Sequence, residues 1–286
     1  MGDLLKGKPV ATAITNEVKK EVEELKARNI YPKLMIVRVG ERQDDLSYEK
    51  AAIKRMQGCG IECEVTATPA DISQDDFIEK LKSVNEDNKV HGILLFRPLP
   101  KHIGEDVVKD IISPHKDIDC FNPANVAKTV EGDKTGFAPC TPAAAMEILK
   151  YNNIDLKGKN AVVIGRSLVV GKPMAMLLLG ENSTVTICHS KTSELAAVAS
   201  GADILVAAIG KAKMITEDFV KEGAVVIDVG INVDADGNIF GDVDTEKCKD
   251  KASFITPVPS GVGSVTTAVL AKHVLKACSF AHKYLI

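Results

Sequence analysis

Residues 161–173, AVVIGRSLVVGKP, have the spacing of a phosphate-binding turn. Gly165, Ser167 and Gly171 follow an apolar, β-rich run and precede a helical run, in the pattern G-x-S-x-x-V-G-x-P. A tight turn between a strand and a helix aims backbone N–H groups at an anion. We therefore predict that these three residues bind the phosphates of a dinucleotide. The alternative is an ordinary loop in which both glycines only relieve packing, because the pattern is not the usual G-x-G-x-x-G.

The next apolar run, TVTICHSKT at 184–192, predicts which dinucleotide is bound. In a Rossmann fold an acidic residue at the end of this strand would bind the ribose 2′-hydroxyl of NAD. The sequence instead has His189, Ser190 and Lys191 there, with Arg166 on the glycine turn. These donors suit a 2′-phosphate, so NADP is the predicted cofactor. The alternative is that Arg166 and Lys191 are solvated surface charges.

The elements that must position these residues follow an alternating order. Apolar, β-rich runs with helical patterns between them occur at 34–39, 61–66, 92–96, 161–165, 184–188, 204–208 and 225–230. This order predicts parallel sheets with crossover helices. Runs such as AVVIG and AVVIDVG have no polar alternation, which is typical of strands covered on both faces. The predicted fold class is α/β, with an α/β catalytic domain and a Rossmann-type parallel-sheet nucleotide domain.

Two proline-rich segments predict the domain boundaries. GFAPCTP at 136–142 precedes a helix that we expect to begin near Pro142, and TPVPSGVGSVT at 256–266 precedes a final apolar helix at 267–278. We expect this last helix to pack on the first domain. The prediction is a catalytic domain of residues 1–140 plus 267–286 and a nucleotide domain of residues 141–266.

Composition excludes several classes of protein. The net charge of -3, from 36 basic and 39 acidic residues, offers no excess for nucleic acid or anionic lipid. The amino-terminal residues lack the order of a secretory signal, and no apolar run has the length of a membrane span. The 7 cysteines are scattered without C-x-x-C spacing, which disfavours a disulfide framework or a structural zinc site. We expect a cytoplasmic protein with reduced, mostly buried thiols and with no metal, nucleic acid or membrane partner.

Further motifs occur in a fixed order along nearly the whole chain. They are VG at 39–40 with Tyr48 eight residues beyond, GILLFRPLP at 92–100, PHKDIDCFNP at 114–123, PCTP at 139–142, VIDVGIN at 226–232, GDV at 241–243 and TPVPSGVGSVT. Together with GRSLVVGKP they resemble the bifunctional methylenetetrahydrofolate dehydrogenase and methenyltetrahydrofolate cyclohydrolase family. The resemblance implies NADP-dependent oxidation of 5,10-methylenetetrahydrofolate to 5,10-methenyltetrahydrofolate. It also implies a folate pocket in a cleft between the two domains, and a homodimer.

The resemblance assigns roles to individual residues. Tyr48 matches the aromatic residue that stacks on the folate ring system, and Asp119 matches the aspartate that binds the pterin. The alternatives are a tyrosine that caps a core and an aspartate that serves a turn. Arg97 is a further catalytic candidate. Gly210 and Ile231 complete the expected cofactor contacts. The remaining expected substrate contacts are Pro98, Leu99, Pro100, Pro259 and Gly261.

The sequence departs from the family at a polar pair. The family has a lysine four residues after the tyrosine, on the same helix face, and a glutamine that partners it. Here these positions are Ala52 and Phe96. Lys50 and Lys54 each lie two residues from Ala52, about 200° around an ideal helix, so neither replaces the lysine. We interpret the loss of both partners as concerted. Removing only one would leave a buried polar group unpaired, which costs about 1 to 3 kcal/mol.

The two family reactions depend on that lysine unequally. Hydride transfer needs positioning of the reacting carbons, whereas ring opening needs proton transfer by a group of tunable pKa. Arg97 supplies charge but stays protonated. We therefore expect dehydrogenase activity to survive and cyclohydrolase activity to be weakened, lost or carried by another group. Lesser departures are Cys120, Ser260, Ser264 and Val265, where the family has glycine, glycine, proline and methionine.

Two other functions remain open. One is a non-catalytic paralogue that binds NADP or folate. The other is a different two-domain Rossmann dehydrogenase, which shares the architecture but not the chemistry. The intact Tyr48, Asp119 and nucleotide turn argue against the paralogue. The PLP turn at 98–100 and PVPSGVG at 257–263 argue against the different dehydrogenase, which gives no reason for both segments.

Overall fold

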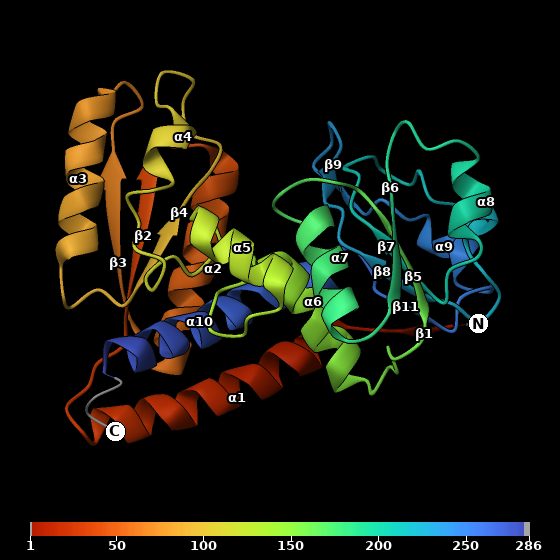
Figure 1. Cartoon of the computed structure of the whole chain (residues 1–286), viewed down its shortest axis with the longest axis horizontal. Helices are drawn as coiled ribbons and strands as arrows, with labels where there is room; N and C mark the ends of the chain where they lie inside the picture. The colour runs from red at the N-terminus through yellow and green to blue at the C-terminus, as the bar shows by residue number, and fades with distance from the viewer. Residues whose placement is uncertain (1, 283–286) are drawn as a thin grey trace. The chain divides into compact units, whose positions relative to one another are not determined.

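The structure, a computed structural model, describes residues 2–282 and divides into two compact units (Figure 1). The six-stranded unit contains the chain up to Ala11 together with Thr141–Thr266, and the three-stranded unit contains Thr12–Cys140 and the chain from Thr267 onward. The predicted α/β fold class is confirmed. The division differs from the predicted 1–140 plus 267–286 at the amino terminus, because the short strand Asp3–Leu4 pairs with the sheet of the other unit.

The three-stranded unit is built on a parallel sheet in the order β3-β2-β4. Its strands are β2 (Lys33–Val39), β3 (Glu62–Thr68) and β4 (Gly92–Leu95). The helices are α1 (Gly7–Lys26), which begins in the other unit, α2 (Gln43–Cys59), α3 (Gln74–Glu86), α4 (Glu105–Val108), α5 (Pro123–Glu131) and α10 (Thr266–Ala281). The predicted final helix is therefore present and belongs to this unit.

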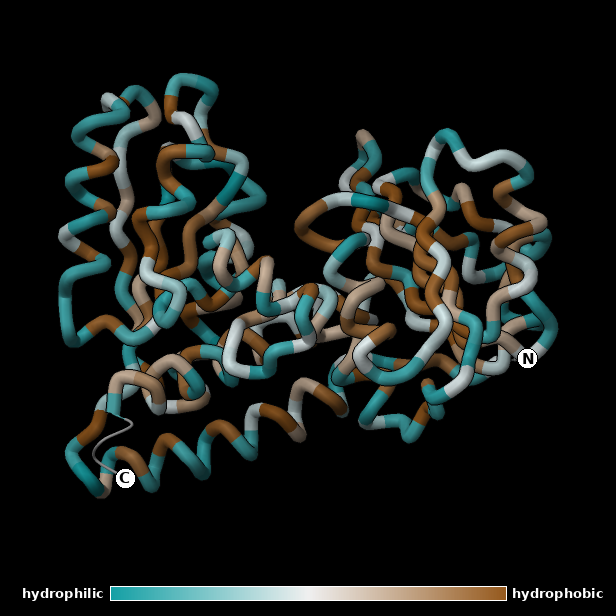
Figure 2. The backbone as a smooth tube through the Cα atoms, viewed as in Figure 1, coloured by the Kyte–Doolittle hydropathy of each residue, from teal (hydrophilic) through white to brown (hydrophobic). Residues whose placement is uncertain are grey.

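Alternation along β2 builds the core of this unit. Met35 and Val37 share one face of the sheet and pack with Phe77 and Leu81 of α3. Figure 1 shows α3 lying along the sheet, and Figure 2 shows its apolar residues alternating with polar ones. Ile36, which points to the opposite face, is also fully buried. Both faces of β2 are covered, as its continuous apolar run predicts.

The six-stranded unit has the strand order β1-β11-β8-β7-β5-β6, and all of its pairings are parallel. Its strands are β1 (Asp3–Leu4), β5 (Asn160–Ile164), β6 (Thr184–Cys188), β7 (Ile204–Ala207), β8 (Val225–Asp228) and β11 (Phe254–Ile255), and a separate antiparallel pair is formed by β9 (Asn232–Val233) and β10 (Ile239–Phe240). The helices are α6 (Cys140–Tyr151), α7 (Gly171–Gly180), α8 (Leu195–Ala199) and α9 (Thr245–Cys248), with 3₁₀ turns η1 (Glu217–Phe219) and η2 (Val262–Ser264).

Strand register aligns the loops that carry the predicted cofactor residues. Ile164 at the end of β5 pairs with Cys188 of β6 and with Ala207 of β7, and Ala207 pairs with Asp228 of β8. The loops after these four strands therefore begin at one edge of the sheet. In doubly wound sheets ligands bind outside this carboxyl edge.

Two sequence-level expectations concern the chain as a whole. Six of the 7 cysteines are buried as small apolar groups, and Cys63 is half-buried. Within residues 2–282, no helix combines the length and the apolar character needed to cross a bilayer.

Candidate functional site

The turn between β5 and α7 brings three backbone segments into close approach. Gly165 has a φ of 141°, which side-chain-bearing residues rarely adopt, and a Cβ on it would overlap the carbonyl group of Ala208. A Cβ on Gly171 would in turn overlap the backbone of Gly165. Both glycines are therefore required by packing. A phosphate role has to rest on the other groups of the turn.

Ser167 supplies such a group. Its Oγ accepts the N–H of Val170 at 3.0 Å and the N–H of Gly171 at 3.4 Å, and the side chain is exposed. A hydroxyl that accepts these bonds can still donate its own proton outward. The turn leads directly into α7, whose dipole favours an anion at its first residues.

The predicted 2′-phosphate donors follow adjacent strands. Arg166 comes after β5, and Ser190 and Lys191 come after β6; all three side chains are exposed. Gly165 N–H donates to the carbonyl of Cys188 at 2.9 Å, so the two loops start side by side. His189 orders the second loop, because its Nδ1 accepts the N–H of Lys191 at 3.1 Å.

Loops after β8 and before α10 enclose a cavity of about 210 Å³ in the six-stranded unit. Three predicted site residues line it: Ile231, Pro259 and Gly261. Ile231 is 63 % exposed, which is unusual for an isoleucine and suits an apolar contact with a ligand. The structure thus brings together residues that the sequence assigned separately to cofactor and substrate.

Two buried carboxylates next to this cavity were not predicted as site residues. Asp228 ends β8 and Asp242 follows β10. Asp228 Oδ1 accepts the N–H groups of Gly230 and Asp242, and its Oδ2 accepts that of Val243. Burial raises the pKa of Asp228 to about 7, although these backbone hydrogen bonds lower it. The available signal was that Asp228 lies two residues before a glycine in VIDVGIN and that Asp242 directly follows a glycine in GDV.

In the three-stranded unit, Tyr48 lies half-buried on α2 with its ring edge-on to Phe96, 5.9 Å between ring centroids. Ala52, one turn along, is fully buried. Lys50 and Lys54 are both exposed. The environment of Tyr48 on this side is therefore apolar where the family has a lysine and a glutamine.

The aspartates of the D-x-D segment have different environments. Asp117 is buried, and its carboxylate accepts the N–H groups of Phe121 and Asn122 and an amide N–H of Asn125. It therefore serves the turn. Asp119 is half-buried, and its Oδ1 accepts the N–H of Cys140 at 2.8 Å; burial raises its pKa, against the lowering effect of that bond.

Cys120, beside Asp119, has a φ of 59°. This left-handed conformation costs a residue other than glycine about 1 kcal/mol or more. The position therefore has the backbone that favours the glycine of the family pattern. The departure changes the side chain but keeps the geometry of the loop.

Arg97 and the PLP turn border the same region. The Arg97 guanidinium lies 4.4 Å from the centre of the Phe121 ring. The Leu99 N–H donates to Glu105 at 3.0 Å, and the Pro100 carbonyl accepts the N–H of Ile103. Because these main-chain groups already have partners, the turn offers a ligand mainly the carbonyl groups of Pro98 and Leu99.

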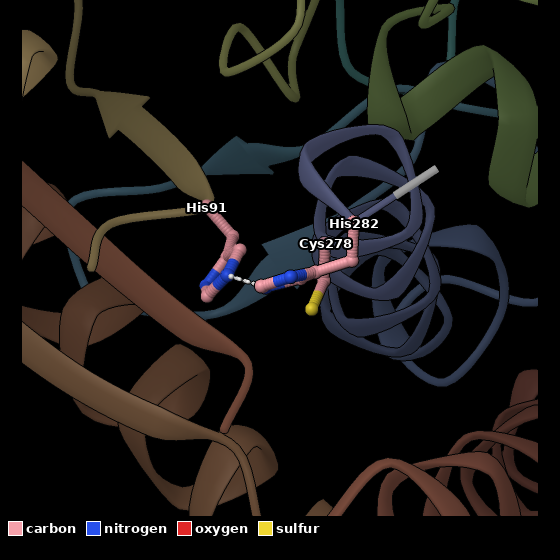
Figure 3. A group of neighbouring side chains, drawn as sticks. All are labelled: His91, Cys278 and His282. Carbon is pink, nitrogen blue, oxygen red and sulfur yellow. Dashed lines mark hydrogen bonds between the residues drawn. The ribbon is translucent and has the colours of Figure 1, made fainter. Parts of the chain in front are cut away.

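A group of potential metal ligands that the sequence analysis missed lies where α10 ends (Figure 3). Cys278 lies in the last turn of α10, His282 follows the helix directly and is four residues on, and His91 faces them. His91 Nδ1 accepts the N–H of Lys33 at 3.2 Å, so the proton of its neutral ring is on Nε2, directed at His282 Nε2 3.2 Å away.

This hydrogen bonding disfavours a metal ion at the three residues. Burial lowers the pKa of His91 to about 4, so the ring is neutral near pH 7, and burial raises the pKa of the Cys278 thiol to about 11. A metal would need the His91 nitrogen that carries the proton. We interpret the histidines as a hydrogen-bonded pair that ties α10 to the residue before β4.

Comparison with known proteins gives matches over both units. Residues 5–119 match the family model for the catalytic domain of tetrahydrofolate dehydrogenase/cyclohydrolase, and residues 139–282 match that for its NAD(P)-binding domain. A bifunctional protein FolD from Clostridioides difficile is 62% identical, over 97% of this chain and 96% of that protein. Another, from Alkaliphilus oremlandii, is also 62% identical, over 99% of each chain.

Two solved structures are similar throughout. The bifunctional enzyme FolD of Campylobacter jejuni has a TM-score of 0.95 and 40% identity, covering 98% of this chain and 99% of that one. The methylenetetrahydrofolate dehydrogenase-cyclohydrolase of Trypanosoma brucei, complexed with NADP cofactor and inhibitor, has a TM-score of 0.92 and 33% identity, covering 98% of each chain.

The raised pKa of Asp228 predicts how stability depends on pH. The unfolded carboxyl ionises near its usual value of 3.8 and the folded one near 7, so the unfolded state loses its proton first. Wild-type stability should therefore fall, relative to Asp228→Asn, by about 1.4 kcal/mol per pH unit near pH 5.5, and the difference should level off above pH 7. Urea unfolding of both proteins across pH 4 to 8 measures this difference. Asp236→Asn, at an exposed site, should give a curve parallel to wild type; a parallel curve for Asp228→Asn would contradict the assignment.

Proposed function

Since the chain belongs to the tetrahydrofolate dehydrogenase/cyclohydrolase family, we propose that it oxidises 5,10-methylenetetrahydrofolate to 5,10-methenyltetrahydrofolate with NADP. The observation that carries the proposal is the carboxyl edge of the six-stranded sheet, where the loops after β5, β6 and β8 bring together the glycine turn, the basic residues and the cavity lined by Ile231. The named activities of the similar proteins support it.

The residues at this edge fit NADP. Packing of Gly165 and Gly171 fixes the shape of the turn, and Ser167 can donate a hydrogen bond to a phosphate. We assign the 2′-phosphate to Arg166 and Lys191 with Ser190, because cationic donors at this position compensate its charge. Bound NADP supplies the hydride acceptor. Gly210 and Ile231 complete the proposed contacts, the latter through its exposed apolar side chain.

The folate site is proposed on the three-stranded unit. Tyr48 offers a flat, amphipathic face to the pterin ring. Asp119 uses Oδ1 for Cys140, so Oδ2 is the oxygen that we expect to accept N–H groups of the pterin. The carbonyl groups of Pro98 and Leu99 and the Arg97 guanidinium are the remaining proposed contacts on this unit. Binding of NADP or folate without hydride transfer, or dehydrogenase activity on a different substrate, would contradict this proposal.

The chemistry demanded of these residues is mainly positional. Hydride transfer needs the two reacting carbons about 3 to 3.5 Å apart, with no protein group that gains or loses a proton. Ring opening of the methenyl product does need proton transfer. Ala52 and Phe96 provide no proton, so we propose that this chain hydrolyses the methenyl product slowly.

We also propose that the protein is cytoplasmic and a homodimer. Its composition and the bacterial relatives support the location. β6 supports association, because it is an edge strand that leaves Thr184, Thr186 and Ile187 exposed.

A spectrophotometric assay tests the proposed reaction. Wild-type protein with methylenetetrahydrofolate and NADP should form NADPH and methenyl product together. Asp119→Asn keeps an oxygen for Cys140 but turns an NH₂ group toward the pterin, so we expect kcat/KM to fall about tenfold to a hundredfold through a higher folate KM. Asp110→Asn, exposed in the same unit, serves as the control. No NADPH from wild type, or an unchanged Asp119→Asn, would reject the assignment.

Cofactor choice tests the 2′-phosphate assignment. Arg166→Gln and Lys191→Gln each remove one cation, so each should raise the KM for NADP about tenfold and leave the KM for NAD within twofold. Lys157→Gln, at an exposed site before β5 and at the opposite edge of the sheet, should change neither constant. Equal effects on NADP and NAD would show that these residues do not contact the 2′-phosphate.

Restoring the polar pair tests the hydrolysis proposal. Wild type should open methenyltetrahydrofolate little faster than buffer. The double variant Ala52→Lys with Phe96→Gln should accelerate ring opening about a hundredfold, because it supplies a proton-transfer group with a partner. NADPH formation reports whether the variant is folded. Strong wild-type hydrolysis that survives Lys54→Ala would show that another group carries the step.

A further inference from the structure

Three consecutive backbone N–H groups after β7 converge on one side chain. Ile209 and Gly210 donate to Asp242 Oδ2 at 2.6 and 3.0 Å, and Lys211 donates to Asp242 Oδ1 at 2.8 Å. Asp242 is fully buried. Successive amide groups of this kind form a concavity that binds anions. Here the chain fills that concavity with its own carboxylate.

The same carboxylate reaches the loop after β8. Asn232 Nδ2 donates to Asp242 Oδ1 at 3.0 Å. Three of the four donors lie after β7, and the fourth, Asn232, lies after β8. The last residues of these two strands, Ala207 and Asp228, pair with each other. Asp242 therefore links the β7 loop to the β8 loop. All four of these donors are backbone or side-chain amide groups, and their dipoles compensate the charge of the carboxylate.

Asp228 holds Asp242 from the other side. Asp228 Oδ1 accepts the Asp242 N–H at 3.0 Å, and Oδ2 accepts the N–H of Val243 at 2.9 Å. A Cβ on Gly230 would overlap the Asp242 carboxyl group, and a Cβ on Gly241 would overlap that of Asp228. Each carboxylate thus occupies space that a glycine leaves open. The backbone around Asp242 has little freedom to move.

The contacts of Asp228 and Asp242 fix the position of residues that line the cavity of about 210 Å³. Asp228, Gly230 and Ile231 line the cavity, and the β7 loop with Gly210 is fixed beside them by Asp242. Since the β7 amides are occupied, an anionic ligand group is directed to the turn after β5 instead. The cavity then remains for a flat ring without an anionic group.

We propose that Asp242 is a positioning residue of the cofactor site, which holds the loops after β7 and β8 in the geometry that receives the nicotinamide half of NADP. This inference rests on the proposed function. Asp242 acts through Gly210 and Ile231 and does not itself touch the cofactor. Asp228 supports Asp242 in this role.

Asp242→Asn tests the role with little change of shape. Each oxygen of Asp242 accepts two N–H groups, so in either orientation of the asparagine amide its NH₂ group faces two donors that have lost their acceptor. We expect the Kd for NADPH, titrated without folate, to rise at least about tenfold, and the Kd for methylenetetrahydrofolate, titrated without NADP, to stay within twofold. Asp244→Asn is the matched control, because that carboxylate instead pairs with Lys247 at 3.6 Å.

A second variant and a rescue keep the test decisive if Asp242→Asn is unstable. Asn232→Ala removes the donor to Asp242 together with the longer hydrogen bond from Asn232 Nδ2 to the Phe240 carbonyl at 3.4 Å, and should weaken NADPH binding several-fold with folding intact. Asp242→Ala leaves a space that formate can fill, so saturable recovery of NADPH affinity by formate is expected there and not in Asp244→Ala.

The outcomes separate this inference from the proposed function. A wild-type protein that forms no NADPH would reject the proposed function. A working wild type would instead overturn the role of Asp242 if NADPH and folate affinities fell equally in Asp242→Asn, if Asp244→Asn behaved the same, or if Asn232→Ala bound NADPH as wild type does.

Discussion

Backbone N–H groups that follow buried strands have to find acceptors, and in this protein the chain supplies them from its own side chains. An unpaired buried amide costs about 1 to 3 kcal/mol, so loops at a sheet edge are held where acceptors exist. Asp242 does this after β7, Asp228 after β8 and Ser167 at the turn after β5. The shape of the proposed cofactor site follows from these pairings.

The pairings work only because the strands end together. The parallel register places Ile164, Cys188, Ala207 and Asp228 in one row, so loops from distant parts of the chain begin as neighbours. Glycines then allow the backbones to meet. Gly165 accommodates the Ala208 carbonyl group, which no larger residue would permit. Sheet register, close packing and amide pairing thus depend on one another at this edge of the sheet.

In the three-stranded unit, two neighbouring carboxylates have different roles. Asp117 is fully committed to the turn that contains Asn122 and Asn125. That commitment fixes the loop and leaves Asp119, two residues on, with a single bond to Cys140 through Oδ1. Elsewhere in the same unit, Tyr48 contacts Phe96 edge-on. This apolar contact suits the binding of a flat ring better than the transfer of a proton.

The amino-acid pattern by itself determined the α/β class and the positions of the longer buried strands, because a strand covered on both faces needs a continuous apolar run. β6 was predicted with the bounds that the structure has. The roles of Tyr48, Asp119 and the cofactor residues came from motifs and remain predictions. The expectation that Ala52 stands where the family has a lysine came from the resemblance and also remains a prediction.

Only the tertiary structure decided the features that depend on long-range pairing. β1 and β11 have two residues each, too few for a periodic pattern; β11 forms by pairing with β8, and β1 forms by pairing with β11. Their pairing assigns the amino-terminal residues to the six-stranded unit. Asp228 and Asp242 stand in motifs that were visible, yet they are 14 positions apart, and the carboxylate of one serves the backbone of the other. Such a contact leaves no periodic signal, because it is made by folding the intervening β9–β10 pair back onto the sheet edge.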